Sequence, residues 1–112
     1  MKTEVILPRN GYPARVRNHV SSKLEGLARF FEGTVSVRAH LQKEHGKHRV
    51  ELLANVRRGV VLVVESRDSR MSAALDDSIE RMGRVLTRHK EKIKLARRKG
   101  QAKPSRGSGV RA

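Results

Sequence analysis

Residues 34–65, TVSVRAHLQKEHGKHRVELLANVRRGVVLVVE, carry the pattern that decides the fold. Apolar and polar residues alternate over 34–41 and again over 49–56, which is the period of a strand with one buried face. The third run, 60–65, is continuously apolar, so we expect it to be covered on more than one side or to pair centrally in the sheet. Three such strands in succession predict an antiparallel meander with one polar face.

Two polar breaks separate the three runs. The first, 43–47, reads as a hairpin loop, and the second, Arg57-Arg58-Gly59, reads as a tight turn whose glycine suits a positive φ. His45 and His48 lie three residues apart at the first break, a spacing that a metal site can use. No third ligand is evident and lysines flank the pair, so we interpret both as surface histidines.

Helical periods flank the meander on both sides. Residues 2–7 form a short β-prone segment, and the period becomes helical over 13–31. Pro13 suits a first helical turn, and Gly33 stands where a left-handed residue commonly closes a helix. The apolar positions that predict this helix are Val16, Val20, Leu24, Leu27 and Phe31.

The second helix is predicted to begin after an N-cap at Asp68 or Ser69 and to run from 70 to about 97. At 1.5 Å per residue it would be about 40 Å long, so we expect its C-terminal end to project beyond so small a body or to fray. The apolar stripe that would face the core is Met71, Ala74, Leu75, Ile79, Met82, Leu86 and Ile93.

The predicted order is β-α-β-β-β-α, an α+β two-layer sandwich. A four-stranded sheet would carry two helices on one face and leave the other face partly solvated. Residues 1–97 are predicted to form this single domain. Residues 98–112 hold Gly, Ser, Pro and basic residues without an acid, so we predict a disordered basic tail there.

Composition narrows the class of protein. The chain has 26 Lys and Arg against 11 Asp and Glu, a formal net charge of +15 at pH 7, which directs it toward nucleic acid or an anionic membrane surface. It has no cysteine, which excludes disulfides and thiolate metal sites. No apolar run approaches the roughly 20 residues of a membrane span, and the N-terminus lacks the apolar segment of a secretory signal. We therefore expect a cytoplasmic protein.

The most basic segment is residues 81–99, RMGRVLTRHKEKIKLARRK, with nine Lys or Arg and one acid. Steps of three and four place four of its bases on one helical face: Arg81, Arg84, Arg88 and Lys92. An ordinary solvated face mixes both signs of charge, whereas this one predicts a polyanionic partner whose phosphates the bases would meet. Lys23 and Arg29 would extend the positive surface if the two helices lie side by side; Arg15 and Arg17 are weaker candidates.

The three aromatic residues, Tyr12, Phe30 and Phe31, all lie outside the predicted strands, which disfavours a base-stacking sheet. Basic helices are best suited to a structured RNA that a protein recognises by its shape more than by its sequence. No catalytic constellation is evident, and Asp76 and Asp77 are explained by a helix N-terminal region that favours anions. We therefore predict no enzyme activity, no cofactor, no metal and no small-molecule substrate.

The helix-two sequence also carries a family resemblance. Ala73-Ala74-Leu75-Asp76 and the run from Ile79 to Lys92 resemble the ribosome hibernation promoting factor family, also called ribosome-associated inhibitors or sigma-54 modulation proteins. The segment 19–24 with Leu27 resembles the first helix of that family. The resemblance covers about residues 1–96. The chain departs from the pattern at Arg70 and Ser72, where the family usually has an acid and a Tyr, and at Gly26, where a Lys is common.

The resemblance implies a fold related to double-stranded-RNA-binding domains. It implies docking on ribosomal RNA in the channel of the small subunit that messenger and transfer RNAs use, which would block translation and keep ribosomes idle. The RNA-facing positions that it implies are Lys23, Arg29, Arg81, Arg84, Arg88, His89, Lys90 and Lys92. The chain would be a short form without the dimerisation domain of the long members, and we expect it to be monomeric alone.

Two alternatives remain open at this point. One is a general binder of structured RNA, of the double-stranded-RNA type, or of DNA. Such domains usually carry a lysine cluster at the start of the last helix, whereas here the bases gather at its far end. The other is a small enzyme that acts on an anionic substrate, which the missing reactive constellation disfavours.

Overall fold

The computed structural model describes the backbone of residues 1–102 and the side chains of residues 1–98. Most of the predicted tail, 103–112, lies outside the described residues. The observed elements are β1 (Lys2–Ile6), α1 (Arg15–Glu25), the 3₁₀ helix η1 (Gly26–Phe30), β2 (Thr34–Glu44), β3 (Lys47–Val56), the 3₁₀ turn η2 (Arg57–Gly59), β4 (Val60–Asp68) and α2 (Met71–Ala102).

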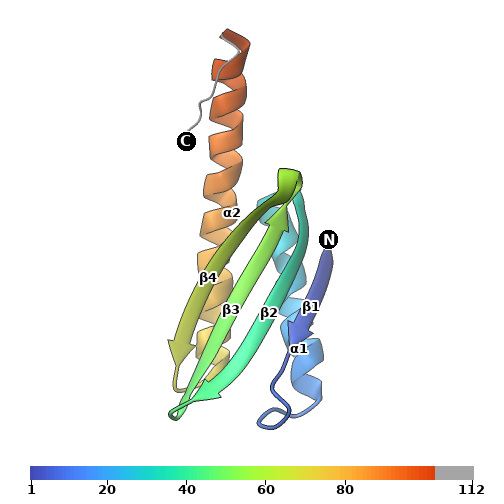
Figure 1. The fold of residues 1–112 in the computed structure, drawn as a ribbon, viewed down its shortest axis with the longest axis vertical. Coiled ribbons are helices and arrows are strands. Elements are labelled where there is room, and N and C mark those ends of the chain that lie inside the picture. The colour runs from blue at the N-terminus through green and yellow to red at the C-terminus, as the bar shows by residue number, and fades with distance from the viewer. Residues whose placement is uncertain (103–112) are drawn as a thin grey trace.

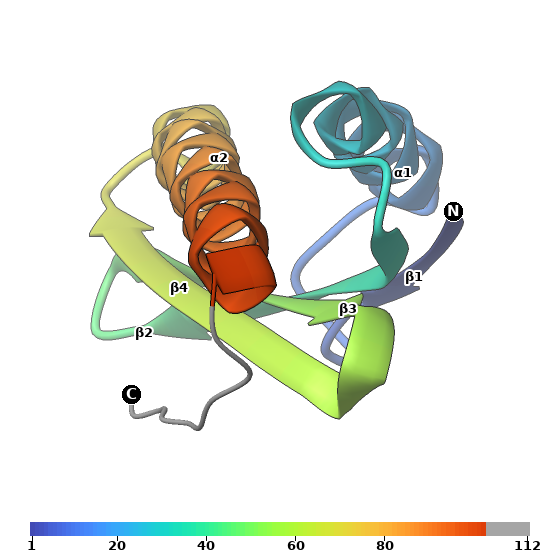
Figure 2. The same cartoon turned by 90° about the horizontal axis from the view of Figure 1, so that it is seen from above.

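The four strands form one sheet in the order β1-β2-β3-β4 (Figure 1). β1 pairs with β2 in parallel, and the β2–β3 and β3–β4 pairs are antiparallel. Both helices lie side by side on one face of the sheet (Figure 2). The predicted α+β two-layer sandwich is confirmed.

Alternation within the strands decides which sheet face the helices cover. Leu41, Val50, Leu52 and Ala54 are fully buried, whereas Asn55 in the same strand as Leu52 is exposed. Because successive side chains of a strand point to opposite faces, the apolar set of the meander faces the helices and the polar set faces solvent. The sequence pattern therefore predicted this half of the core correctly except at Val35, which lies at a β-bulge between Thr34 and Ser36 and is 57% exposed.

β4 differs from its prediction. It lies at the edge of the sheet, and Val61 and Val63 are 49% and 52% exposed on the uncovered face. Leu62 and Val64 instead face inward and pack against the core, where α2 covers them. A continuous apolar run is compatible with either environment, since it has no period that marks a solvent face. The expectation of a central or doubly covered strand was wrong.

The first helix is shorter than its apolar period suggested. α1 ends at Glu25 and the chain tightens into η1 at Gly26, a residue that weakens an α-helix. Gly33 does not take a positive φ, so it is not the left-handed closure that we expected. A Cβ at Gly33 would lie 2.4 Å from Cζ of Phe31, so the buried Phe31 ring requires a glycine there.

α2 provides the longest apolar stripe of the core. Leu75, Met82 and Leu86 are fully buried against the sheet, and the backbone N–H of Arg70 donates to Asp68 Oδ1 (3.0 Å) just before the helix begins. The helix continues to Ala102, and Figure 1 shows its C-terminal part rising past the end of the sheet. The predicted projection is confirmed, and the helix runs beyond the predicted limit near residue 97. No helix in the described part of the chain is long and apolar enough to cross a membrane.

The β2–β3 hairpin closes more tightly than the predicted loop, through His45 and Gly46 at φ values of 52° and 78°. His48 beyond this turn is half-buried rather than a free surface histidine. Its Nδ1 lies 2.6 Å from the hydroxyl of Tyr12, and Lys43 lies over the Tyr12 ring. Burial and the nearby Lys43 ammonium lower the pKa of His48 below its usual 6.5, and burial raises the pKa of Tyr12.

This geometry predicts a pH dependence of stability. Because the folded protein lowers the His48 pKa, the unfolded chain binds more protons than the folded one below about pH 6.5, and acidification destabilises the fold. We expect the free energy of unfolding, measured by denaturant titration, to fall between about pH 7 and pH 5. The fall should be smaller in His48→Gln. His19→Gln, on the exposed side of α1, serves as the control and should retain the wild-type fall.

Candidate nucleic-acid interface

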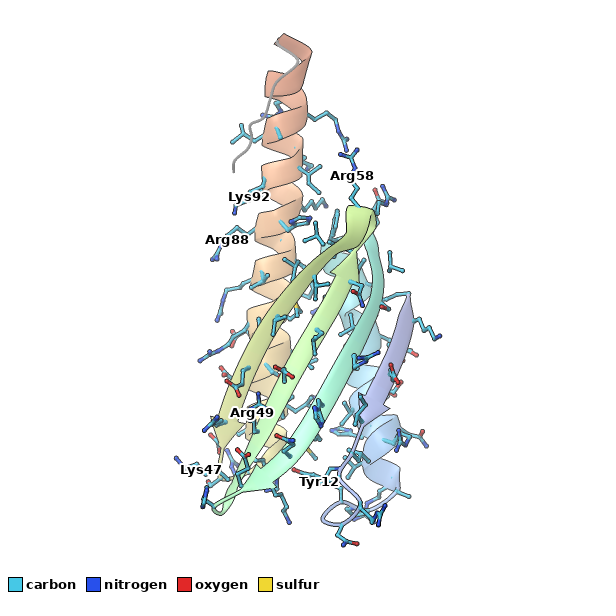
Figure 3. The ribbon with its side chains drawn as sticks, in the orientation of Figure 1. Tyr12, Lys47, Arg49, Arg58, Arg88 and Lys92 are labelled. Atoms are coloured by element: carbon cyan, nitrogen blue, oxygen red, sulfur yellow. The ribbon has the colours of Figure 1, made fainter. Side chains whose placement is uncertain are left out.

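The solvent side of α2 presents a line of positive side chains, the cationic ridge, formed by Arg81, Arg84, Arg88 and Lys92. All four are exposed, because the apolar stripe on the opposite side of the helix holds α2 on the sheet. Figure 3 shows Arg88 and Lys92 pointing outward from the same side of the helix. The four residues predicted to share one face therefore do so.

Two members of the ridge have partners within the molecule. Arg81 Nε lies 3.0 Å from Asp77 Oδ2, and that same oxygen accepts a hydrogen bond from Ser66 on β4 (2.6 Å). Arg84 forms a looser pair with Glu80 at 3.5 Å. The side chains of Arg81 and Arg84 remain 52% and 60% exposed, so neither guanidinium is buried against a carboxylate.

The free charge of the ridge is concentrated in its C-terminal half. Within the described part of the chain, Arg88 and Lys92 form no ion pair with a carboxylate. Exposed i, i+4 pairs such as that of Arg84 contribute only about 0.3–0.5 kcal/mol, so a phosphate can readily replace Glu80. Arg81 is the least available of the four to an external phosphate, because it pairs with Asp77, which is itself hydrogen-bonded to Ser66 on β4.

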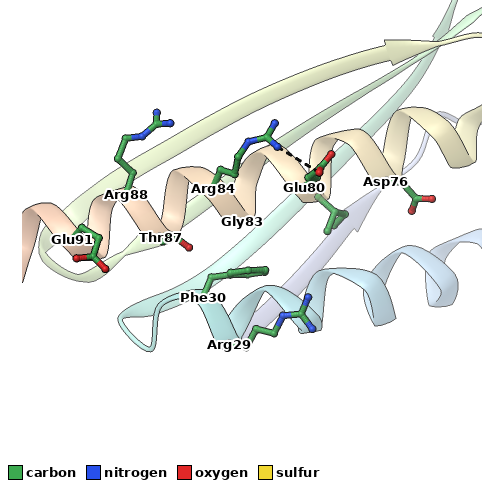
Figure 4. Close-up of a pocket in the computed structure, with 10 residues that line it drawn as sticks. Arg29, Phe30, Asp76, Glu80, Gly83, Arg84, Thr87, Arg88 and Glu91 are labelled. Atoms are coloured by element: carbon green, nitrogen blue, oxygen red, sulfur yellow. Dashed lines mark ion pairs between the residues drawn. The ribbon is translucent and has the colours of Figure 1, made fainter.

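A groove of about 810 Å³ runs between η1 and α2, beside the ridge (Figure 4). Arg29 of η1 and Arg84 and Arg88 of α2 contribute to its lining, and Figure 4 shows the side chains of Arg84 and Arg88 pointing away from η1. The lining also includes the carboxylates of Asp76, Glu80 and Glu91. The Arg29 guanidinium lies 4.8 Å from the centre of the Phe30 ring, a cation–π distance. The structure thus brings three of the predicted RNA-facing arginines to one groove.

Phe30 also lines the groove, a role that its sequence position did not indicate. Gly83 on α2 approaches its ring so closely that a Cβ there would lie 3.0 Å from the Phe30 ring. This contact explains a glycine in the middle of a long helix. Phe30 and Phe31 are adjacent, yet Phe31 is buried and Phe30 only half-buried. The sequence signal that could have indicated this role is the pair of consecutive aromatic residues at the end of a helical period.

Lys23, predicted to extend the positive surface, already has an acidic partner within the protein. Its Nζ lies 2.8 Å from Asp76 Oδ1, so the pair joins α1 to α2 near the N-terminal end of the groove. Asp76, which the sequence analysis explained by the helix N-terminus, therefore has a specific partner. Lys23 remains on the helical side of the protein, with its charge balanced locally.

His89 and Lys90 do not belong to the ridge. His89 follows Arg88 by one residue, about 100° around the helix, and its ring packs edge-on against Phe31 with 5.5 Å between centroids. Lys90 follows Gly83 by seven residues and so shares the groove side of α2. Both are only partly exposed. The eight predicted RNA-facing residues therefore occupy several adjoining surfaces of the helical layer.

The uncovered sheet face has a different electrostatic character. Arg38 pairs with Glu4 (3.0 Å), and Glu65 accepts a hydrogen bond from Arg49 Nε and lies 3.6 Å from Arg67. The hydrogen bond from Arg49 lowers the pKa of Glu65, so this carboxylate stays charged. Arg38, Arg49 and Arg67 of the sheet face thus have acidic partners, whereas among the described side chains of α2 Arg88 and Lys92 do not. The unbalanced positive charge lies on the helical side.

Comparison with known proteins agrees with this architecture. The family model described as "Sigma 54 modulation protein / S30EA ribosomal protein" matches residues 12–94. A ribosome hibernation promoting factor from Azotobacter vinelandii is 31% identical over 86 residues, which are 77% of this chain and 78% of that protein.

Two solved structures share the fold. The N-terminal domain of Protein Y from Thermus thermophilus has a TM-score of 0.69 at 24% identity and covers 80% of this chain and 99% of its own. A ribosomal subunit interface protein from Coxiella burnetii has a TM-score of 0.68 at 13% identity, with 81% and 99% covered. The residues matched by the family model, 12–94, include α1, α2 up to residue 94, the groove between η1 and α2, and the cationic ridge. The chain belongs to the sigma 54 modulation protein / S30EA ribosomal protein family.

Proposed function

We propose that this protein is a ribosome-binding hibernation factor that docks on ribosomal RNA in the messenger- and transfer-RNA channel of the small subunit and keeps ribosomes idle. It would act in the cytoplasm as a monomer, with the ridge and the groove of the helical layer against RNA. Binding is sufficient for this function, because a protein that occupies the channel excludes the RNAs that translation needs.

The observation that carries the proposal is the exposed positive charge of Arg88 and Lys92 on the ridge, which forms no ion pair among the described residues, beside the groove that Arg29, Arg84 and Arg88 line. Guanidinium forks suit bidentate contact with phosphate oxygens. The family and the name of the Azotobacter relative, a ribosome hibernation promoting factor, support the ribosome as the source of those phosphates.

The RNA-facing set that we propose is the one implied by the family resemblance: Lys23, Arg29, Arg81, Arg84, Arg88, His89, Lys90 and Lys92. Their positions suggest unequal contributions. Arg84, Arg88 and Lys92 would contact phosphates directly, whereas Lys23 and Arg81 must first exchange the carboxylates of Asp76 and Asp77. We expect the first group to dominate affinity.

Ribosome pelleting tests the proposal. The protein should sediment with small subunits, and its association constant should fall on the order of a hundredfold between roughly 50 and 200 mM salt if four ridge charges each meet a phosphate. Ribosomes that already hold messenger RNA and transfer RNA in the channel should bind the protein much more weakly. Binding that is equally strong to naked RNA or DNA duplexes would favour the general nucleic-acid binder instead.

A further inference from the structure

A second hollow, the arginine pocket, lies where α2 passes the end of the sheet. It has a volume of about 180 Å³ and is formed between the η2 turn and α2. Phe31, Val60 and Ile93 form its apolar walls. Its polar lining consists of Arg57, Arg58, His89 and Arg97.

Every ionisable side chain that lines this pocket is a base. Within the described part of the chain, Arg57, Arg58 and Arg97 form no ion pair with a carboxylate. Three exposed guanidinium groups around one small pocket repel one another. An anion in the pocket would remove this cost and supply acceptors for the N–H donors.

The backbone of the η2 turn supports a binding role for Arg58. Arg58 has a φ of 71°, a left-handed conformation that non-glycine residues rarely adopt, and Gly59 beside it has a φ of 73°. Glycine or asparagine would take this conformation at lower cost. Strain at a long charged side chain is a reason to look for a function. Figure 3 shows Arg58 at the end of the sheet from which α2 projects.

His89 is held in position by the core. Its ring packs edge-on against Phe31, which is only 7% exposed, so the orientation of the imidazole is fixed by a buried partner. The residues that line this pocket come from η2, from the start of β4, from the residue that follows η1 and from α2. No single sequence segment contains them.

We propose that the arginine pocket binds one phosphate group, as a monoester or a diester. The forks of Arg57, Arg58 and Arg97 would donate to its oxygens, and His89 would add a ring N–H. The site is separate from the cationic ridge. Where the phosphate is that of ribosomal RNA, this inference rests on the proposed function; where it belongs to a free phosphate compound, it does not.

Titration with inorganic phosphate, followed by amide NMR shifts of the whole protein, tests the site. We expect shifts at Gly59 and His89, and about tenfold weaker binding in Arg97→Gln, since a charged hydrogen bond contributes about 1.5–3 kcal/mol. Arg98→Gln removes the same charge from the next residue, which does not line the pocket, and should bind as the wild type does. Arg58→Gly should weaken binding while the melting temperature stays equal or rises, because glycine relieves the strained φ.

Equal phosphate binding by Arg97→Gln and Arg98→Gln, or shifts spread evenly along the ridge, would overturn the proposal. Ribosome pelleting of the same variants then identifies the source of the phosphate. Weaker pelleting of Arg97→Gln than of Arg98→Gln assigns it to ribosomal RNA, and equal pelleting assigns it to a free phosphate compound. A wild-type protein that fails to pellet refutes the proposed function alone, since the phosphate titration does not use ribosomes.

Discussion

The double variant Arg84→Glu/Arg88→Glu should lose at least about a hundredfold in affinity for small ribosomal subunits, since each charged hydrogen bond to phosphate contributes about 1.5–3 kcal/mol. Both side chains are exposed and line the interhelical groove. Reversal of their charge removes two phosphate contacts and places two carboxylates against the RNA. Quantitative pelleting at fixed salt measures the change.

The matched control is Arg38→Glu/Arg67→Glu on the uncovered sheet face. It changes the net charge by the same amount, but both residues lie near acidic partners, away from the helices. We expect its affinity to fall by less than about tenfold, through the long-range field alone. Melting temperatures of both variants show whether each is folded. Equal losses in the two variants would mean that net charge, not the ridge, determines binding.

Leu86→Ala should destabilise the fold by about 2–5 kcal/mol, the usual cost of a large cavity in a closely packed core. Leu86 is fully buried in the stripe that fastens α2 to the sheet. The variant should lower both the free energy of unfolding and, through a loosened α2, the affinity for ribosomes. Denaturant titration measures the first effect.

Leu95→Ala is the control in the same helix. Leu95 is 51% exposed on the part of α2 that projects, so the same chemical change should alter stability by no more than about 0.5 kcal/mol. A large loss in Leu95→Ala would show that the projecting part of α2 contributes to the stability of the fold. A small loss in Leu86→Ala would contradict the packing of α2 described above.

Much of this fold could be predicted because local pattern and tertiary structure agree. Alternation over 34–41 and 49–56 places Leu41 and Leu52 on the buried face, and the α2 stripe places Leu75 and Leu86 there. In each case a single period determines which side chains are buried. The cationic ridge was predictable for the same reason, since it is the opposite side of the α2 period.

The errors arise where burial depends on partners distant in sequence. The valines of 60–65 fit a central or an edge strand, and only the sheet order makes β4 an edge. Leu27 lies in a 3₁₀ helix but still continues the apolar period of the α-helix before it. The tighter turn also directs its side chain into the core, where it is fully buried. Periodicity does not reveal a change of helix type.

The composition of the site was harder to predict than its location. The groove requires Phe30 of η1 opposite Gly83 of α2, a contact between residues more than 50 positions apart. The ion pair of Lys23 with Asp76 likewise depends on how the two helices lie on the sheet. Arg58 and Arg97 line the same pocket only because α2 continues past the end of the sheet.

Directed hydroxyl-radical probing of the ribosome complex tests the central claim most directly, because the chain has no native cysteine. An iron chelate can be attached at Thr87→Cys, on the groove side of α2, or at Asn55→Cys, exposed on the uncovered sheet face. We expect strong cleavage of small-subunit ribosomal RNA from position 87 and weak or no cleavage from position 55. Stronger cleavage from position 55 would place the sheet, not the helices, against the RNA and would contradict the account.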